Sequence, residues 1–163
     1  MNASLAVMGT RIAAHLRARG ETVAITESAT GGLINAALVA VPGASAWYLG
    51  GSIIYTAAGR VALHGLSAGD LNGVRPSTQA YARLLASRMR AQLGATWGLA
   101  ETGAAGPTGS RYGDPAGHAC IAVSGPFEDA LTIETGATDR EANMWAFARE
   151  AIAFLDRCIE RAG

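Results

Sequence analysis

A serine stands where a hydrophobic strand gives way to a helix. In the stretch "VAITESATGGLI", which begins at Val23, residues 22–26 have strand chemistry, and after the two glycines apolar residues recur with a helical period. Ser28 therefore falls at the bend, above the carboxyl end of a sheet and beside the free N–H groups that open a helix. Its hydroxyl could act as a nucleophile, with the N–H groups of residues 29–31 stabilising the oxyanion. Alternatively, Ser28 or Thr30 caps the helix.

Two more polar segments are predicted to reach the same edge of the sheet. Tyr55 and Thr56 follow a second strand, with Arg60 shortly after, and Glu101 begins the stretch "ETGAAGPTG" after a third strand. Glycines there would let backbone N–H groups approach a phosphate or carboxylate, although a simple turn is an equally good interpretation. The predicted ligand contacts in the three segments are Glu27, Thr30, Gly31, Gly32, Thr56, Thr102, Gly103, Ala105, Gly106 and Gly109.

The elements that must position these residues alternate between helices and strands. The predicted helices are residues 5–20, residues 33–41, a short alanine-rich helix carrying Arg60 and His64, residues 77–93 and residues 139–161. The predicted strands are residues 22–26, 51–55, 97–100, 118–123 and 130–135. The last two flank a turn at Gly125-Pro126, and residues 103–117 form a glycine-rich loop. We expect one α/β domain over residues 1–163: a three-layer α/β/α sandwich with a mixed, mostly parallel sheet of about five strands and a C-terminal antiparallel hairpin.

Composition limits the class of ligand and the compartment. The 163 residues are 50% hydrophobic and 16% charged, and 13 basic residues balance 13 acidic ones, so neither nucleic acid nor an anionic membrane is an expected partner. The start lacks a basic and then apolar leader, and no apolar run nears the roughly 20 residues of a membrane span, which predicts a cytoplasmic protein. Cys120 and Cys158 have no disulfide or metal-ligand spacing. No metal or other cofactor is expected.

All thirteen basic residues are arginines, and the chain has no lysine. Arginine stays protonated at any workable pH and cannot serve as a general base. A mechanism that needs a lysine base is therefore excluded.

Four motifs carry a resemblance to a known family. In the order and spacing of "TESATGG", "GGSIIYT", "GAAGPTG" and "DPAG", nearly the whole chain is similar to the C-terminal domain family of the competence/damage-inducible protein CinA, whose stand-alone members include nicotinamide-nucleotide amidases. The resemblance implies an α/β/α sandwich and metal-free hydrolysis of nicotinamide mononucleotide to nicotinate mononucleotide and ammonia. It implies that Ser28 is the nucleophile, that Tyr55 is an active-site residue, and that backbone at Gly31-Gly32 and at residues 103–109 surrounds the ligand. Arg140 falls in a family Asp-Arg pair and is a possible phosphate contact, with Asp139 as a helix cap.

The chain departs from the family pattern at several positions. That pattern is close to ESCTGG, a tyrosine with a polar stretch and a lysine, GxAGPxGG, and KPVG. Here Ala29 replaces cysteine, residues 56–58 are less polar, Arg60 replaces the lysine, Glu101 takes a usually apolar position, and Asp114 replaces the KPVG lysine. Because an arginine cannot accept the serine proton, the base must be another group.

Two groups could replace the missing base. Arg60 could hold Tyr55 partly as phenolate, which would then accept the proton. Alternatively, Glu101 could accept it directly or through water, with Arg60 orienting the carboxylate or the substrate phosphate. We favour a site rebuilt around Glu101 and Arg60, because opposite charges at one cleft could compensate each other. Ordinary strand packing for Tyr55 and a paired strand-end role for Glu101 stay open.

Other functions and an assembly are also compatible with the sequence. The chain could be a nucleotide-binding homologue that senses or sequesters its ligand without hydrolysis, or a hydrolase of a different small amide. Residues 47–49, Trp-Tyr-Leu, are expected in a loop, where exposed aromatics often mark an interface, although burial against their own sheet is equally plausible. We expect a homo-oligomer, which the family resemblance supports.

Overall fold

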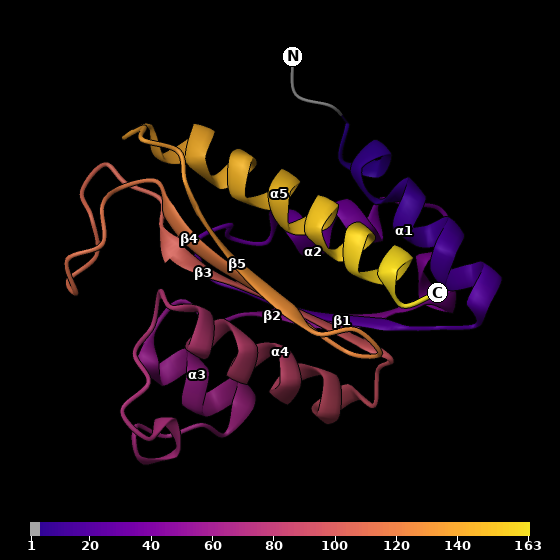
Figure 1. The fold of residues 1–163 in the computed structure, drawn as a ribbon, viewed down its shortest axis with the longest axis horizontal. Coiled ribbons are helices and arrows are strands. Elements are labelled where there is room, and N and C mark those ends of the chain that lie inside the picture. Colours follow the sequence, from indigo (N-terminus) through magenta and orange to yellow (C-terminus); the bar gives the residue numbers. More distant parts are fainter. Residues whose placement is uncertain (1–3) are drawn as a thin grey trace.

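A five-stranded sheet lies between two layers of helices in the computed structural model, which describes residues 4–163 (Figure 1). The strands are β1 Val23–Glu27, β2 Tyr48–Ile53, β3 Trp97–Ala104, β4 His118–Ser124 and β5 Asp129–Glu134. Their spatial order is β2-β1-β3-β4-β5. Strand β1 pairs in parallel with β2 and β3, whereas β4 is antiparallel to both β3 and β5. The predicted mixed sheet with a C-terminal hairpin is confirmed.

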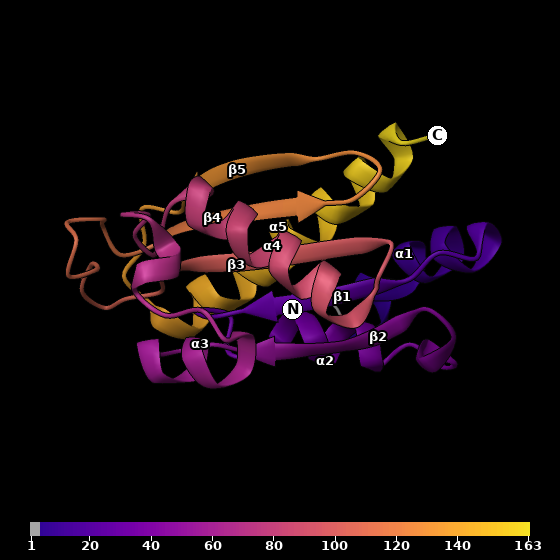
Figure 2. The same cartoon turned by 90° about the horizontal axis from the view of Figure 1, so that it is seen from below.

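The helices divide between the two faces of the sheet. The α-helices are α1 Leu5–Arg19, α2 Leu33–Val39, α3 Ala57–His64, α4 Gln79–Leu93 and α5 Arg140–Arg161, and short 3₁₀ turns lie at Ala44–Ala46 and Gly69–Leu71. Helices α1, α2 and α5 cover one face, and α3 and α4 cover the other, as the two views in Figures 1 and 2 show. This arrangement confirms the α/β/α sandwich.

Alternation along the strands sends different side chains to the two helical layers. On β3, Trp97 and Leu99 belong to the core beneath α1, α2 and α5, whereas Ala100 packs toward α4. Successive strand residues point to opposite faces, so Glu101 points to the same side as Leu99. Strands β1 and β4, on either side of the central strand β3, are buried along their whole length, which explains their largely apolar sequence.

Strand β2 begins at Tyr48, earlier than the sequence pattern predicts, so the predicted loop is wrong for Tyr48 and Leu49, whereas Trp47 does lie in the turn before the strand. Trp47 is fully buried in the core, and the Tyr48 hydroxyl donates a 2.5 Å hydrogen bond to Asn35 Oδ1. Burial against their own sheet, the alternative interpretation, accounts for both aromatic rings. Leu49 stays 42% exposed on this edge strand. Self-association remains a prediction, but the aromatic rings no longer support it.

Strand β3 also runs further than expected, through Ala104, so Glu101 and Thr102 are strand residues. Within residues 4–163, no helix combines the length and apolar character needed to cross a bilayer. Residues 1–3, on which the predicted absence of a leader partly depends, lie outside the described residues.

Candidate functional site

A cavity of about 650 Å³ lies at the carboxyl ends of β1, β2 and β3. The predicted site residues that line it are Ser28, Tyr55, Thr56, Arg60, Thr102, Gly103, Ala105, Gly106, Gly109 and Arg140. The three segments that the sequence predicted at one sheet edge therefore do meet.

Ser28 lies in the turn between β1 and α2. The Gly31 N–H donates to the Ser28 carbonyl oxygen at 3.0 Å, and Gly32 precedes α2 with φ +104°. A side chain at Gly32 would be strained at that φ and would meet Ile53 Cδ1 at 3.0 Å, which accounts for a glycine just before the helix. The Ser28 hydroxyl makes no hydrogen bond to any residue between 4 and 163, so it is available to a ligand in the cavity.

Glu27 is buried beneath this turn, inside the protein, and does not line the cavity. Its carboxylate is fully buried and accepts hydrogen bonds from the N–H groups of Gly32 at 2.9 Å and Asn35 at 2.8 Å, so it caps α2. Four residues predicted as ligand contacts are outside the cavity wall and build the turn itself: Glu27, Thr30, Gly31 and Gly32. The physical reason is that the N–H groups of a helix start need acceptors, and here the protein supplies them.

Glu101 is also buried beneath the turn. Its Oε2 accepts hydrogen bonds from the Ser28 N–H at 3.0 Å, the Thr30 N–H at 3.1 Å and the Thr30 hydroxyl at 2.9 Å. Burial raises the pKa of Glu101 to about 7, and the hydrogen bonds from Ser28 and Thr30 lower it by less than burial raises it. Glu101 neither lines the cavity nor bonds the Ser28 hydroxyl, so its position does not fit a direct base.

The predicted oxyanion donors are mostly occupied. Thr30 N–H donates to Glu101, and Gly31 N–H donates to the Ser28 carbonyl oxygen. Of the three N–H groups predicted for this role, only that of Ala29 has no acceptor in the described part of the chain.

Arg60 does not pair with Glu101, and this prediction is wrong. Its side chain is 7% exposed, and its Nε–H donates to the Leu66 carbonyl oxygen at 3.0 Å, which fastens the segment after α3. Arg60 lies in the layer of α3 and α4, whereas the Glu101 carboxylate contacts the turn before α2 on the opposite face. The sheet separates the two charges.

Arg140, rather than Arg60, holds Tyr55. Its Nη2 donates to the Tyr55 hydroxyl oxygen at 2.5 Å, and its Nη1 donates to the Gly106 carbonyl oxygen at 2.6 Å. The predicted Asp139 cap is confirmed, since its carboxylate accepts from the Ala142 N–H at 2.9 Å. The first turn of α5 therefore links the tyrosine to the glycine-rich loop.

The glycines of that loop are required by internal packing. A Cβ at Gly103 would lie 2.5 Å from the His118 carbonyl oxygen, and one at Gly109 would lie 2.1 Å from the Asp114 carbonyl oxygen. The Ala105 carbonyl oxygen accepts a 2.8 Å hydrogen bond from Asn143 Nδ2 of α5. The loop is thus a fixed wall of the cavity.

Sequence reasoning missed Ser77 as part of the wall. It lies before α4 with φ +61°, is 5% exposed and lines the cavity. Its N–H donates to Thr102 Oγ1 at 3.1 Å, and its carbonyl oxygen bonds His118 Nε2 at 2.9 Å. Thr102, a predicted ligand contact, therefore already has a partner within the protein. No local motif marks Ser77.

Two arginines of the wall were also missed. Arg75 forms two hydrogen bonds to Asp114, of 2.8 and 3.0 Å, and this guanidinium lowers the pKa of Asp114 to about 2. The guanidinium groups of Arg75 and Arg111 lie 5.3 and 5.7 Å from the centre of the Tyr112 ring. The Arg75–Asp114 pair joins residues 39 apart, so only the fold brings them together.

The cavity is therefore suited to an anion. Arg60, Arg75, Arg111 and Arg140 line it, and no aspartate or glutamate does so among residues 4–163. Asp114, which does not line the cavity, neutralises the charge of Arg75. Arg111 has no carboxylate partner among residues 4–163. A phosphate or carboxylate on a small ligand would complete the charge balance.

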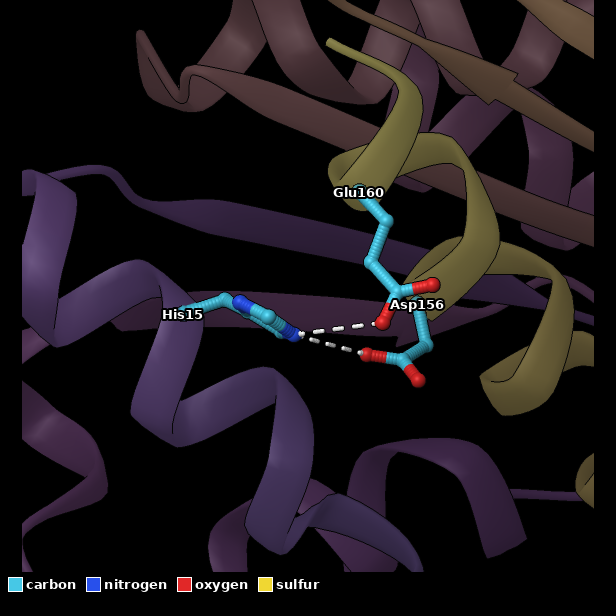
Figure 3. Close-up of side chains that lie close together, drawn as sticks. All are labelled: His15, Asp156 and Glu160. Atoms are coloured by element: carbon cyan, nitrogen blue, oxygen red, sulfur yellow. Dashed lines mark ion pairs between the residues drawn. The ribbon is translucent and has the colours of Figure 1, made fainter. Parts of the chain in front are cut away.

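A histidine and two carboxylates meet away from the cavity, between α1 and α5 (Figure 3). His15 Nε2 lies 3.5 Å from Asp156 Oδ1 and 3.8 Å from Glu160 Oε1. Arg11 also contacts both carboxylates, at 3.0 and 2.5 Å, so their charge already has a partner. We interpret this cluster as ion pairing between two helices.

Fold and cavity together define an α/β/α protein with a serine at a strand-to-helix turn, facing an arginine-lined cavity. The chain matches the CinA C-terminal domain over residues 6–159 and belongs to that family. A CinA-like protein of Prochlorococcus marinus (strain MIT 9313) is 44% identical over 122 residues, which are 74% of this chain and 28% of the relative. A CinA-like protein of Synechocystis sp. is 34% identical over 150 residues, which are 92% of this chain and 36% of the relative. The chain thus spans about a third of the length of these relatives.

Solved structures of the same superfamily share the fold. A competence-damaged protein (CinA) superfamily structure from Klebsiella pneumoniae aligns with a TM-score of 0.89 and 26% identity, covering 98% of this chain and 99% of that one. A competence/damage inducible protein from Agrobacterium tumefaciens aligns with a TM-score of 0.84 and 26% identity, covering 96% of each chain.

Proposed function

We propose that this domain is an amidohydrolase that converts nicotinamide mononucleotide and water to nicotinate mononucleotide and ammonia. The observation that carries the proposal is the Ser28 hydroxyl, which has no partner within the described chain and borders a cavity lined by arginines. Family membership supports a catalytic serine at this turn. The expected compartment is the cytoplasm, where this nucleotide would be met.

The reaction follows acyl transfer through serine. Ser28 Oγ attacks the carboxamide carbon, the C–N bond breaks, and ammonia leaves with the serine proton. Water then attacks the resulting ester, which releases the carboxylate and restores the hydroxyl. The Ala29 N–H, which has no protein acceptor in the described chain, is the candidate donor to the oxyanion.

Tyr55 is the candidate that receives the serine proton. It is 61% exposed and lines the cavity, and Arg140 at its oxygen would balance the negative charge of a phenolate. No hydrogen bond joins the Tyr55 and Ser28 hydroxyls, so the transfer would pass through water or follow closure around the substrate. Arg60 is excluded as the base, since a guanidinium does not release its proton.

The arginines would recognise the phosphate of the mononucleotide. Arg111 has no carboxylate partner in residues 4–163, and Arg140 donates only to uncharged oxygens. Of the four arginines in the wall, Arg75 is paired with Asp114 and Arg60 is only 7% exposed, so Arg111 and Arg140 carry the positive charge that a ligand can reach.

The test compares turnover with binding. Purified protein is incubated with nicotinamide mononucleotide, ammonia is measured by a coupled assay, and the product is identified by chromatography. Affinity is measured by calorimetry with the same ligand. Ammonia release with equimolar nicotinate mononucleotide supports the proposal. A protein that does not bind the nucleotide and releases no ammonia from it contradicts the proposal. A panel of other small carboxamides tests whether the altered polar stretch at residues 56–58 has changed the substrate.

A sensor without hydrolysis is the second candidate function. It is favoured by one observation: within the described chain, no side chain that could act as a base hydrogen-bonds the Ser28 hydroxyl. Tight binding of nicotinamide mononucleotide without ammonia release at any pH would support this function over the amidase.

A further inference from the structure

Two buried carboxyl groups meet at one hydroxyl beneath the Ser28 turn. The parallel register of β1 and β3 pairs Thr26 with Ala100, so Glu27 and Glu101 follow side by side, and both are 0% exposed. Thr30 Oγ1 lies 2.9 Å from Glu101 Oε2 and makes a still closer contact with Glu27 Oε2. Glu101 is absent from the cavity wall, so a role other than contact with the ligand must explain it.

The hydroxyl between the two carboxyl groups has a single proton to donate. If both groups were ionised, one of the two contacts of Thr30 would join acceptors only. A proton on Glu101 removes this conflict, since Glu101 then donates to Thr30 and Thr30 donates to Glu27.

The distribution of donors decides which group carries the proton. Glu27 accepts from the backbone N–H groups of Gly32, Ile34 and Asn35 and from the Asn35 side-chain amide, a set of donors to both oxygens that suits a carboxylate. Glu101 accepts from two backbone N–H groups, those of Ser28 and Thr30, and both donate to Oε2. Glu101 Oε1, by contrast, is buried with no hydrogen-bond partner among the described residues. Burying a charged carboxylate oxygen without a hydrogen-bond donor carries a large free-energy penalty. The penalty is smaller for the carbonyl oxygen of a neutral carboxylic acid.

Among residues 4–163, no cation contributes to the raised pKa of Glu101. The titratable groups near it are Glu27 on β1 and Cys120 on β4, and Tyr48 on β2 lies beyond Glu27. On the α5 side, Phe147 and Met144 pack in the apolar cluster with Ala29. None of the groups that shift the pKa of Glu101 is an arginine.

We propose that Glu101 is a positioning residue that works as a neutral acid: it donates to Thr30, which donates to Glu27, and it fixes the Ser28 turn through the N–H groups of Ser28 and Thr30. The raised pKa of Glu101, about 7, is consistent with this role. The positioning part rests on the proposed function, whereas the location of the proton does not.

The pH dependence of stability tests whether Glu101 is protonated in the folded chain, and it needs no assay of activity. Burial raises the pKa of Glu101 from 4.5 to about 7, so the folded chain holds a proton that the unfolded chain releases between these values. The stability that this proton contributes is present below about pH 4.5 and is lost as the pH rises to about 7. Glu101→Gln keeps the shape and does not titrate.

Unfolding is therefore followed in the wild type, Glu101→Gln and Glu128→Gln from about pH 5 to about pH 8. The control, Glu128, is an exposed carboxylate on the turn between β4 and β5. We expect the Tm of Glu101→Gln minus that of the wild type to rise up to about pH 7 and to level off above it, and the Tm difference for Glu128→Gln to stay flat. A flat or falling difference for Glu101→Gln overturns the proposal.

A second measurement covers the case in which Glu101→Gln does not fold. The infrared spectrum of the wild-type chain should contain the band of a buried protonated carboxyl group at about pH 6, and this band should disappear by about pH 9. Thr30→Val, which removes the bridging hydroxyl, should shift that band, whereas Thr30→Ser should not. Absence of the band at about pH 6 overturns the proposal.

The positioning role is read from the pH profile of turnover. The ratio of the wild-type kcat to that of Glu101→Gln should fall severalfold as the pH rises through about 7, with KM within about twofold. A folded Glu101→Gln that is inactive at every pH would mean that the ionised carboxylate is required, and overturns this role. Absence of turnover in the wild type overturns the positioning role together with the proposed function. The unfolding series still tests whether Glu101 carries a proton in the folded chain.

Discussion

Arg140 donates a 2.5 Å hydrogen bond to the Tyr55 hydroxyl, so the start of α5 rather than α3 positions the tyrosine at the cavity. The same guanidinium holds the Gly106 carbonyl oxygen. One arginine thereby couples the second and third motifs of the site, and its loss should affect catalysis more than folding.

Replacing Arg140 should therefore lower turnover. We expect Arg140→Gln to reduce kcat for nicotinamide mononucleotide by about tenfold or more, since charge balance at the proton acceptor is lost. Arg83→Gln, an exposed arginine of α4, is the matched control and should leave kcat within about twofold. Steady-state kinetics checks both, and equal kcat values for the two variants would contradict the role of Arg140.

Restoring the family lysine at position 60 should not raise activity. Arg60 Nε donates to the Leu66 carbonyl oxygen and has no hydrogen bond to Ser28, so Arg60→Lys loses a structural contact without gaining a base. We expect a loss of roughly 1–3 kcal/mol in the free energy of unfolding, because a buried acceptor loses its donor. Denaturant unfolding and kcat are measured together. A kcat above the wild-type value would show instead that a serine-lysine pair can form here.

The Arg75–Asp114 pair in the cavity wall should make the stability of the protein depend on pH below about pH 4. Because the pKa of Asp114 is lowered to about 2, its contribution to stability is present above the pKa of an unfolded aspartate, about 4, and is lost as the pH falls toward 2. Asp114→Asn should thus lower Tm at neutral pH, and the difference from wild type should shrink between about pH 4 and pH 2. Arg75→Gln should behave alike, and the double variant should lose less than the sum of the two single losses. Additive losses would mean that the two side chains act independently.

A methyl group at Gly109 should distort the loop that bounds the cavity. An added Cβ would lie 2.1 Å from the Asp114 carbonyl oxygen, so the backbone must shift. We expect Gly109→Ala to raise KM for the nucleotide and lower Tm, whereas Gly69→Ala, where the nearest atom is Ser67 Oγ at 3.7 Å, should leave KM unchanged. Similar KM values for both variants would argue against a fixed wall.

Much of the fold follows from local patterns in the sequence. The change from strand to helical period on either side of Ser28, and the turn between two short apolar runs at residues 118–135, determine the first parallel strand and the hairpin. The convergence of three segments at one sheet edge follows from the parallel topology.

The direction of single side chains could not be predicted in the same way. Whether Glu101 faces the cavity or α2 depends on where β3 ends, and the glycines after it predicted an end that is too early. Tyr48 and Leu49 are predicted in a loop because β2 begins earlier than its β-branched residues suggest, and Trp47 is buried although it lies in the turn before the strand. Arg75 meets Asp114 only through the folded chain, and no local pattern signals that pair.

The most direct test of the central claim is to trap the acyl group on Ser28. Wild-type protein is mixed with nicotinamide mononucleotide and quenched in acid during the first turnover, and the peptide that contains residues 23–34 is examined by mass spectrometry. The account predicts that this peptide gains the mass of the nicotinyl mononucleotide group on Ser28, and that Ser28→Ala binds the ligand within a few fold but releases no ammonia. Undiminished ammonia release by Ser28→Ala, with Ser45→Ala as the exposed control, would contradict it.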